Sequence, residues 1–501
     1  MLTPSPAVRR TVCYLLGVIC VLAHLPLTGC GPGNIAPEQT TPESIPAALR
    51  RKAEGANVVI CVLDAARPDH FGCYGYDRYT TPNIDGLARE SVVFDSHYCQ
   101  ATYTGISTAC LLTGQYPETH LVSRSRPLPE SAFTLARGLE GAGFRTVLFS
   151  SNVMVSPEGP YGNGGDFQEE FSLSKLDPVL LEGEQRFYSP EPLLRLFEDW
   201  LERNESNRFF VYLHFTPPHV PYDMPEKFRL AFAGLRPPDY QADRYHPGEF
   251  DFPVDRENIA VPPLPLWINL YDANLRYGDW AAGEVESRLR QAGVFENTLF
   301  IITSDHGEAF GEHGWVHHGA PWHEEVTHIP LLIKFPSSIR GGRRVAALTE
   351  TVDLLPTICD LFQIPCPEKE VQGRSLLPLV TGDADRIREH VFTRVSEDGG
   401  KYVVRGERYS LLLWANENWR GLYDLAEDPE QRVNLIEREP ERAAELMQAF
   451  RAFAESQRRP PRRYLAGDAK LPPDSTEAEE TERPVLSPEA RKDLEALGYL
   501  K

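Results

Sequence analysis

The chain has few positive charges for its length. Its 501 residues include 51 Lys and Arg against 72 Asp and Glu, so the formal net charge is −21 at pH 7. Such a surface repels the phosphate backbone of nucleic acids and the anionic surface of a lipid bilayer. We therefore expect no nucleic-acid partner. An anionic substrate is not excluded, because a bound metal ion and helix dipoles can reverse the field inside one pocket.

Closely spaced cysteine pairs of the CxxC type are missing from the sequence. A structural zinc site built from thiolates is therefore not expected. Among the nine cysteines, Cys61 lies inside an apolar run and is predicted to be a small buried hydrophobic residue. Cys359 and Cys366 are close enough to form a disulfide in an oxidising compartment, but their spacing alone does not establish one.

The chain also lacks a long uninterrupted apolar run. The candidate near the N-terminus, residues 12–27, contains His24 and Pro26 and is too short for a clear membrane span. It follows a basic pair and ends in the letters LTGC at Cys30, which resembles the lipobox of bacterial lipoproteins. The resemblance implies a lipoprotein signal peptide over residues 1–29 and a lipid on Cys30. A plain N-terminal membrane anchor is the alternative.

Both alternatives predict that the folded part of the chain leaves the cytoplasm. We expect an exported, membrane-anchored lipoprotein of the bacterial cell envelope, located in the periplasm or on the cell surface. Residues 30–55 are rich in Pro, Thr and Glu and lack apolar periodicity, which is typical of a tether between the lipid and a folded domain.

Apolar runs and helical patterns alternate over residues 56–388. This alternation predicts an α/β domain with a doubly wound, mostly parallel sheet flanked by helices. The expected strands are 58–63, 144–149, 209–215, 298–303 and 329–335, and the expected helices include 131–142, 190–203, 270–289 and 351–362. Residues 234–265 form a Pro- and Asp-rich insertion that fits either a lid over the site or a plain surface loop.

Two of the expected strands end in acidic residues. The first apolar run stops at Asp64, and the run at 298–303 is followed by the letters SDHG, which contain Asp305 and His306. In open α/β sheets ligands bind beyond the carboxyl ends of the strands. Thr104 precedes a short helical pattern, where a hydroxyl can cap the helix or face an anion held by its N-terminus. A phosphate-like or sulfate-like group would fit between these residues.

These segments resemble the sulfatase family of the alkaline phosphatase superfamily. The matching stretches near the first strand are LDAARPDHFGCYGY, TPNIDGLA and LLTGQYPETH, and the resemblance covers about residues 56–460. The motifs are specific for the fold and the metal site and less specific for sulfate against phosphate. Counting back from LLTG, the position of the family's nucleophile falls on Thr104.

The C-terminal part is expected to form a subdomain over residues 389–460. Strand-like segments and a Gly-Gly turn precede a helical pattern at 440–455, and the stretch LYDLAEDPEQRVNL matches the family. The resemblance implies a small antiparallel sheet with a helix. Residues 461–501 are predicted to be an extended tail that closes with a short helix, capped by Ser487 with Pro488 at its first position.

Residue types and resemblance together predict one divalent metal site. Its ligands would be Asp64, Asp305, His306 and the hydroxyl of Thr104. Carboxylates suit a hard cation, so calcium is the first expectation, and the imidazole admits zinc or manganese. The metal would lower the pKa of the hydroxyl and polarise an ester oxygen. A helix cap or turn acid is the alternative role for Asp64.

Three further residues are candidates for catalysis by resemblance. Arg67 matches the arginine of the family's first motif and would either neutralise substrate charge or pair with an acid. His219 and His318 match positions that hold a basic residue against the sulfate or phosphate and protonate the leaving oxygen, a role that suits histidine. Hydrogen-bonded loop histidines are the alternative. The other histidines of this region, His313, His317, His323 and His328, are expected to be surface or loop residues.

The chain departs from the family pattern at two places. Many sulfatases have two consecutive Asp residues after the first strand, and here the second is Ala65. The usual Cys-x-Pro-Ser-Arg signature reads TGIST from Thr104, and a threonine cannot be converted to the formylglycine aldehyde. A threonine nucleophile instead resembles the phosphodiesterase and phosphoethanolamine-transferase branches, which attack phosphorus with a metal-activated hydroxyl.

The sequence therefore leaves three functions open. The first is a metal-dependent hydrolase of sulfate esters or related phosphorus esters, acting on a small molecule, a glycan or a lipid headgroup. The second is a phosphodiesterase or phosphoethanolamine-type transferase acting on envelope lipids or glycans, although no multi-span membrane domain is visible in the sequence. The third is a binding lipoprotein without catalysis, which would predict broken metal ligands.

Overall fold

The computed structural model describes residues 44–172, 188–222, 224–232, 264–319, 321–367, 369–395, 399–414, 419–459 and 461. These residues belong to one compact unit that begins at Ser44. The expected signal peptide, Cys30, nearly all of the insertion at 234–265 and the tail beyond residue 461 lie outside the described residues. Among the described helices, none combines the length and the apolar composition that crossing a membrane requires.

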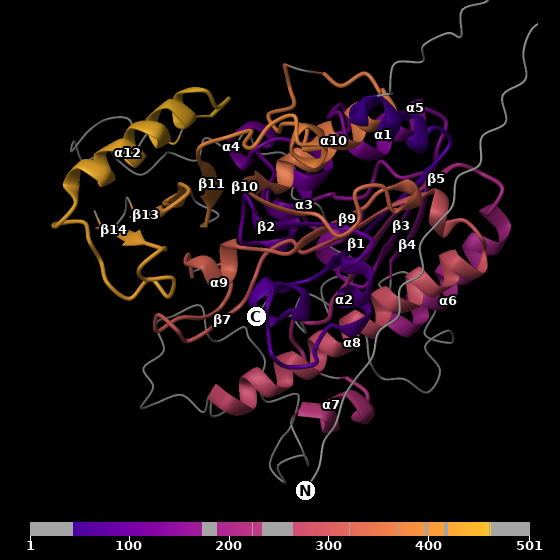
Figure 1. The fold of residues 1–501 in the computed structure, drawn as a ribbon, viewed down its shortest axis with the longest axis horizontal. Helices are drawn as coiled ribbons and strands as arrows, with labels where there is room; N and C mark the ends of the chain where they lie inside the picture. The colour runs from indigo at the N-terminus through magenta and orange to yellow at the C-terminus, as the bar shows by residue number, and fades with distance from the viewer. Residues whose placement is uncertain are drawn as a thin grey trace, which may run out of the picture. The chain divides into compact units, whose positions relative to one another are not determined.

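An eight-stranded sheet forms the centre of the described unit, with the strand order β10-β2-β9-β6-β1-β5-β3-β4 (Figure 1). The strands are β1 (Asn57–Leu63), β2 (Val92–Tyr98), β3 (Arg145–Ser150), β4 (Glu169–Ser172), β5 (Phe209–Phe215), β6 (Thr298–Thr303), β9 (Leu331–Lys334) and β10 (Arg344–Glu350). Only the two pairings of β9, with β2 and with β6, are antiparallel among these strands. The predicted mostly parallel sheet is confirmed.

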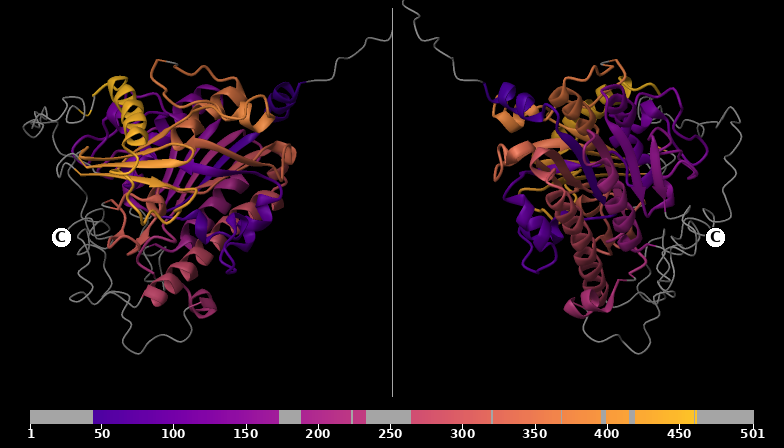
Figure 2. Two further views of the ribbon diagram at one scale, coloured as in Figure 1. Left: turned by 60° about the vertical axis from the view of Figure 1, so that its left-hand side comes forward. Right: turned by 90° about the vertical axis from the view of Figure 1, so that its right-hand side faces the viewer.

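Helices cover both faces of this sheet, as the predicted doubly wound arrangement requires (Figure 2). One face carries α1 (Ile45–Ala53), α3 (Thr104–Thr113), α5 (Leu135–Gly141), α10 (Leu354–Phe362) and α11 (Leu377–Thr381). The other carries α2 (Pro82–Ala88), α6 (Pro190–Asn204), α7 (Glu226–Phe232) and α8 (Leu264–Gln291). Shorter elements are α4 (Pro117–His120), α9 (Glu324–Thr327) and the hairpin of β7 (Ala309–Phe310) with β8 (Val316–His317).

Strand β1 shows how the sequence produces the two layers. All seven of its residues are buried, and successive side chains point to opposite faces of the sheet. Val58, Ile60 and Val62 pack in one apolar cluster, and Val59, Cys61 and Leu63 pack in the other. A strand buried on both faces has a continuous apolar run rather than an alternating one, which is why the run at 58–63 was readable.

A second, four-stranded sheet is formed by the C-terminal residues. Its strands β11 (Val391–Arg394), β12 (Lys401–Arg405), β13 (Tyr409–Trp414) and β14 (Trp419–Asp424) are antiparallel and lie in chain order. Helix α12 (Pro440–Glu455) packs against this sheet through Leu446 and Phe450, which share an apolar cluster with Tyr402 and Leu411. The predicted antiparallel sheet with a helix is confirmed.

The structure also differs from the sequence-based expectations. Strands β2, β4 and β10 were not expected, and each has polar or charged residues within it. Residues 45–53, assigned to the tether, form α1, whose Leu49 and Ala53 are buried in the cluster that contains α10. Cys359 and Cys366 are both free thiols.

Candidate active site

Polar side chains gather where neighbouring parallel strands end. Asp64 follows β1, Asn152 follows β3 by two residues, and Asp305 follows β6 by two residues. His214 lies within β5, in register with Val62 of β1. Because β6, β1, β5 and β3 are adjacent and parallel, their carboxyl ends meet at one edge of the sheet. The fold therefore gathers these side chains at one edge of the sheet.

The Asp64 carboxylate is fully buried and is oriented by two neighbouring strands. Its Oδ2 accepts a hydrogen bond from Asn152 Nδ2 at 2.6 Å and lies 3.2 Å from Nε2 of His214. Burial alone would raise the pKa of Asp64, but the nearby His219, His214 and His306 outweigh burial and hold it below its usual range. Asp64 is therefore an ionised carboxylate whose Oδ2 is held by Asn152, while its Oδ1 is buried without a hydrogen-bond partner among the described residues.

The Asp305 carboxylate is oriented by main-chain donors. Its Oδ1 accepts hydrogen bonds from the backbone N–H of Ala65 at 3.1 Å and of His306 at 3.0 Å. Ala65 has φ of 59°, a left-handed conformation that costs a non-glycine residue about 1 kcal/mol or more. The position that holds a second Asp in many sulfatases thus contributes its backbone N–H to the other acid of the site.

His306 links the two carboxylates to Thr104. Its Nδ1 donates to the carbonyl oxygen of Gly307 at 2.9 Å, so Nε2 carries the lone pair. That Nε2 lies 3.2 Å from Thr104 Oγ1, 3.4 Å from Asp305 Oδ2 and 3.9 Å from Asp64 Oδ1. The four residues predicted as metal ligands therefore converge, and all four are at most 3% exposed.

Thr104 is the first residue of helix α3, and the helix is fixed from two sides. Ser107 donates its hydroxyl to the carbonyl oxygen of Asp305 at 2.7 Å, and Asn163 Nδ2 donates to the carbonyl oxygen of Gly105 at 2.7 Å. A Cβ on Gly105 would lie 2.1 Å from the Tyr161 ring, so this position requires a glycine. The partial positive charge of the α3 N-terminus favours an anion beside Thr104.

The donor set fits a divalent cation. Asp64 Oδ1 and Asp305 Oδ2 are buried and have no hydrogen-bond partner among the described residues. Unpartnered buried carboxylate oxygens are costly, and a cation would satisfy both. Asp64, Asp305 and His214 also form a geometric group, but the Nε2 of His214 faces Asp64 Oδ2, the oxygen that Asn152 holds. His214 therefore contacts the oxygen of Asp64 that Asn152 also holds, and not the unpartnered Oδ1.

His318 lies over His306 and faces Glu308. The two imidazole rings stack with centroids 4.2 Å apart. Glu308 is fully buried, and its carboxylate oxygens lie 3.4 Å from Nδ1 of His318 and 3.3 Å from Nδ1 of His317. Burial opposes ionisation of Glu308, yet His318 and His317 lower its pKa below the usual range. A buried ionised Glu308 therefore holds His318 in one orientation.

His219 approaches the site from the loop after β5. Its backbone N–H donates to the carbonyl oxygens of Asp64 at 3.1 Å and Thr216 at 2.8 Å. Its ring centroid is 4.9 Å from that of His318. Burial lowers the pKa of His219, but the carboxylates of Asp64 and Glu308 outweigh burial and raise it. A small cavity beside His219 is lined by Tyr188, Thr216, Pro221, Asn274 and Tyr277, among others.

Arg67 pairs with acidic residues, which is the second of the two roles predicted for it. Its guanidinium forms paired hydrogen bonds with Asp69 at 3.0 and 2.7 Å and contacts Glu312 Oε1 at 2.6 Å. It also lies over the Phe310 ring, with Cζ 4.8 Å from the ring centroid. In the described contacts Arg67 pairs with acids. It orders the loop after β6 and is separate from the four converging residues.

Three residues of the site were missed from the sequence. Asn152 and Glu308 follow expected strands closely, but their roles depend on which strands become neighbours. His214 is the one basic residue of an otherwise apolar or aromatic run, FFVYLHF, and that mismatch was the available signal. His317 and His323 were expected to be surface or loop residues, and each is only 5% exposed.

Known families match most of the chain. A model of the family named Sulfatase matches residues 56–364. A second model, named N-sulphoglucosamine sulphohydrolase, C-terminal, matches residues 311–457. The two matches together span the eight-stranded sheet, the converging residues and the second sheet.

Individual proteins also match most of the chain, at low sequence identity. The N-acetylglucosamine-6-O-sulfatase of Bacteroides thetaiotaomicron is 21% identical over 474 residues, which cover 77% of this chain and 84% of that protein. The iduronate 2-sulfatase of Mus musculus is 25% identical over 447 residues, 73% and 76% of the two chains. Among solved structures, the phosphonate monoester hydrolase of Agrobacterium radiobacter superposes with a TM-score of 0.66 at 22% identity, covering 79% of this chain and 95% of that one. At that identity the structural likeness concerns the fold.

Proposed function

Because the chain belongs to the sulfatase family and is a hydrolase of the alkaline phosphatase superfamily, we propose that it cleaves sulfate esters or related phosphorus esters with Thr104 as the nucleophile. The observation that carries the proposal is the convergence of Asp64, Asp305, Thr104 and His306 in one buried group. A binding protein without catalysis would have no reason to keep this set together.

The converging residues and their neighbours have different roles in the proposed reaction. Asp64 Oδ1, Asp305 Oδ2, His306 Nε2 and Thr104 Oγ1 would hold one divalent cation, calcium first and zinc or manganese as alternatives. Such an ion supplies Lewis-acid polarisation of the ester and lowers the pKa of a nearby hydroxyl. The N-terminus of α3 stabilises the anionic group of the substrate. Asn152 and His214 keep Asp64 oriented.

The reaction we propose has two steps. The Thr104 hydroxyl loses its proton to solvent and its oxygen attacks sulfur or phosphorus, while the bond to the ester oxygen breaks and the leaving oxygen takes a proton from His219 or His318. Water then attacks the same sulfur or phosphorus atom, gives one proton to the Thr104 oxygen and the other to that histidine, and sulfate or phosphate is released. His318 is held for this role by Glu308, and His219 by its main-chain contact to Asp64.

The threonine at position 104 favours a second candidate function, in which the atom attacked is phosphorus rather than sulfur. A sulfated threonine lacks the elimination route that an aldehyde hydrate provides, so its release must be by direct attack at sulfur. A phosphorylated threonine is released by attack at phosphorus, as in the transferase and phosphodiesterase branches. The phosphorus-ester alternative, including transfer to an envelope lipid or glycan, therefore rests on the side chain at residue 104.

We extend the proposal to substrate and location. The relatives named above act on a sulfated amino sugar and on iduronate, and one solved relative was bound to its substrate D-glucosamine-2-N,6-O-disulfate. A sulfated or phosphorylated glycan, small molecule or lipid headgroup is the corresponding proposal here. The lipobox-like segment ending at Cys30 supports an exported, lipid-anchored protein. Radiolabelled palmitate should label the expressed chain and should not label Cys30→Ala.

The decisive assay compares substrates side by side. The full chain and Thr104→Ala are incubated with 4-nitrophenyl sulfate, 4-nitrophenyl phosphate and bis(4-nitrophenyl) phosphate, with calcium, magnesium, manganese or zinc in turn. Turnover of the sulfate that Thr104→Ala loses supports a threonine-dependent sulfatase. Turnover of the phosphorus esters alone assigns the chain to the phosphodiesterase side. Metal-dependent turnover that Thr104→Ala retains would refute the role of Thr104.

A further inference from the structure

A second histidine–carboxylate cluster lies outside the active site. The imidazole rings of His313 and His323 stack face to face, with centroids 3.5 Å apart and planes inclined by 13°. The Glu325 carboxylate faces both rings, with Oε2 3.8 Å from His313 Nε2 and Oε1 3.9 Å from His323 Nδ1. One ligand atom from each of the three residues lies within 4.8 Å of the other two. We call these residues the loop cluster.

The loop cluster is buried without the partners that burial requires. The side chains of His323 and Glu325 are 6% and 7% exposed, and that of His313 is 15% exposed. His323 Nδ1 and Glu325 Oε1 are buried atoms with no hydrogen-bond partner among the described residues. Burial, followed by the charge of Glu312, raises the pKa of Glu325 to about 8. Buried polar atoms are normally satisfied, so the two unpartnered atoms point to an absent ligand.

The chemistry of the cluster selects the ligand. Two imidazoles and a carboxylate are a donor set that zinc and similar first-row metals prefer, and calcium and magnesium prefer oxygen. In a tetrahedral zinc site with bonds of about 2.1 Å the ligand atoms are about 3.4 Å apart. Glu325 lies 3.8 Å from His313 through Oε2 and 3.9 Å from His323 through Oε1, and one ligand atom of each residue lies within 4.8 Å of the other two. Because imidazole lone pairs lie in the ring plane, the stacked rings must turn for both nitrogens to face one ion.

We propose that His313, His323 and Glu325 bind a zinc ion, with water as the fourth ligand. This site is distinct from the pocket of Asp64, Asp305, His306 and Thr104, and it is proposed whether or not that pocket hydrolyses esters. The three ligands come from the segment 313–325, so the metal closes the base of the loop that carries β8 and His318.

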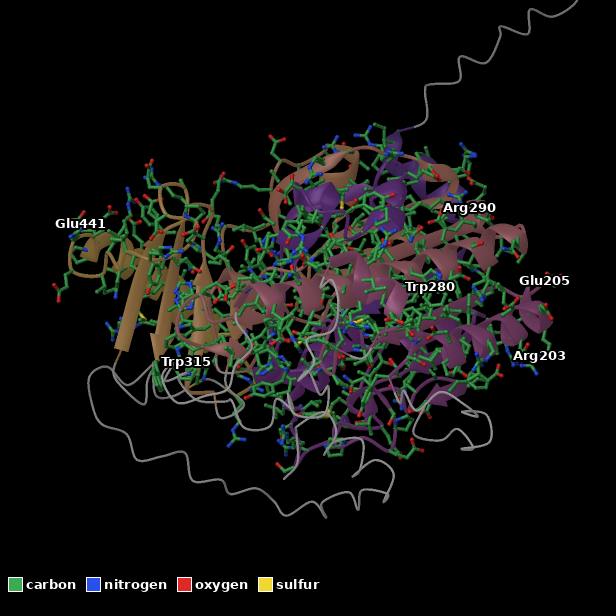
Figure 3. All side chains as sticks on the ribbon, turned by 90° about the horizontal axis from the view of Figure 1, so that it is seen from below. Arg203, Glu205, Trp280, Arg290, Trp315 and Glu441 are labelled. Carbon is green, nitrogen blue, oxygen red and sulfur yellow. The ribbon has the colours of Figure 1, made fainter. Side chains whose placement is uncertain are left out.

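The surroundings show what the metal would hold in place. The backbone N–H groups of Gly307 and Glu308 donate to the carbonyl oxygens of Val326 and Glu325 at 2.9 and 3.0 Å. The loop also reaches the second sheet, because Lys401 Nζ lies 4.9 Å from the Trp315 ring centroid. Trp315 is labelled in Figure 3. The zinc would therefore fasten the His318 loop to both the active-site strand end and the C-terminal subdomain.

The test separates the two metal sites by mutation. The full chain, Asp305→Asn and the double variant Asp305→Asn/His323→Ala are stripped with chelator, dialysed against zinc chloride and analysed for zinc. We expect Asp305→Asn to keep one zinc equivalent and the double variant to lose it. Added zinc should raise the melting temperature of Asp305→Asn and leave that of the double variant unchanged. His390→Ala, a half-buried histidine of the C-terminal part, is the matched control and should keep the wild-type zinc content.

Two further measurements test the zinc site independently of the His323→Ala substitution. If His323→Ala does not fold, Glu325→Gln removes the carboxylate with almost no change in shape and should lose the same zinc equivalent. Anomalous diffraction at the zinc edge should show a peak between the three side chains. Equal zinc content in Asp305→Asn with and without the second substitution, or the absence of that peak, would overturn the proposal and leave a stacked, proton-sharing cluster. Neither result would bear on ester hydrolysis, which the side-by-side assay measures.

Discussion

The two histidine–carboxylate clusters of this chain are supported in different ways. In the active site, Asp64 and Asp305 end neighbouring strands, and backbone N–H groups of Ala65 and His306 already hold Asp305 in place. In the loop cluster, the three side chains are 6 to 15% exposed and ring stacking is the main contact between the histidines. The first arrangement is prepared by the fold, and the second needs an ion to complete it.

The side chains of the two clusters are therefore held in place by different means. Parallel strands fix the positions of the groups at their ends, so the active-site geometry should persist when the cation is removed. Side chains on a loop have more freedom to lose, so metal binding there should contribute directly to stability. The following predictions test this contrast, beginning with the largest expected effect.

Thr104→Ala should remove the nucleophile and leave the fold intact. The side chain is small and buried, and its loss leaves the carboxylates held by their own hydrogen bonds. We expect kcat/KM for the preferred ester to fall roughly 10³-fold or more, because a nucleophile acts in a unit with its neighbours. Steady-state kinetics with saturating metal measures the loss.

Thr104→Ser is the matched control for that change. It keeps a hydroxyl at the N-terminus of α3 and should retain activity within about tenfold of the original chain. If Thr104→Ala and Thr104→Ser are equally inactive, the methyl group rather than the hydroxyl matters, and the nucleophile must be sought elsewhere.

Asp305→Asn should lose the active-site cation while the loop cluster keeps its zinc. The amide preserves the shape but removes the charge at Oδ2, which has no hydrogen-bond partner among the described residues. Activity should fall by roughly 10²–10³-fold, since the charge that stabilises the developing anion is gone. Elemental analysis checks the metal count, and circular dichroism checks the fold. An unchanged calcium content would contradict the assigned ligand set.

His318→Gln and His317→Gln form a matched pair around one acid. Both histidines face Glu308, and His318 also stacks on His306 and lies near His219. We expect His318→Gln to lower kcat by roughly 10²-fold as a proton donor is lost, and His317→Gln to lower it by less than about tenfold. Equal losses would mean that Glu308, rather than His318, sets the activity.

The fold was readable from sequence where strands are buried on both faces. The run at 58–63 became β1, and 298–303 became β6 without any change of bounds. Strand β2 has the sequence VVFDSHY, in which polar residues interrupt the apolar pattern of a buried strand. Its partner strands β9 and β10 come from residues far along the chain, so local pattern did not predict the pairing either. The direction of β9 was not predictable either, since an apolar run has the same composition in both directions.

The candidate site could be predicted in part for the same reason. Asp64, Asp305 and His306 follow the ends of two apolar strands, so pattern and resemblance pointed to the same three residues. Arg67 matches a motif, but its partners Asp69 and Glu312 depend on how the loop after β6 folds back. His313 and His323 are ten residues apart on a loop, and nothing in their spacing predicts that their rings stack.

Gly105→Ala should have the smallest effect and tests whether helix packing positions Thr104. The added Cβ would lie 2.1 Å from the Tyr161 ring, so the ring or the start of α3 must move. Overpacking of this kind costs about 1–3 kcal/mol of unfolding free energy, measured by urea unfolding. Gly86→Ala in α2 is the control, because its Cβ would meet no atom within 4 Å, and it should stabilise the chain by up to about 1 kcal/mol. If Gly105→Ala loses more activity than its loss of stability explains, the packing of α3 against Tyr161 sets the position of the Thr104 hydroxyl. If both variants keep full activity, the strand ends alone suffice.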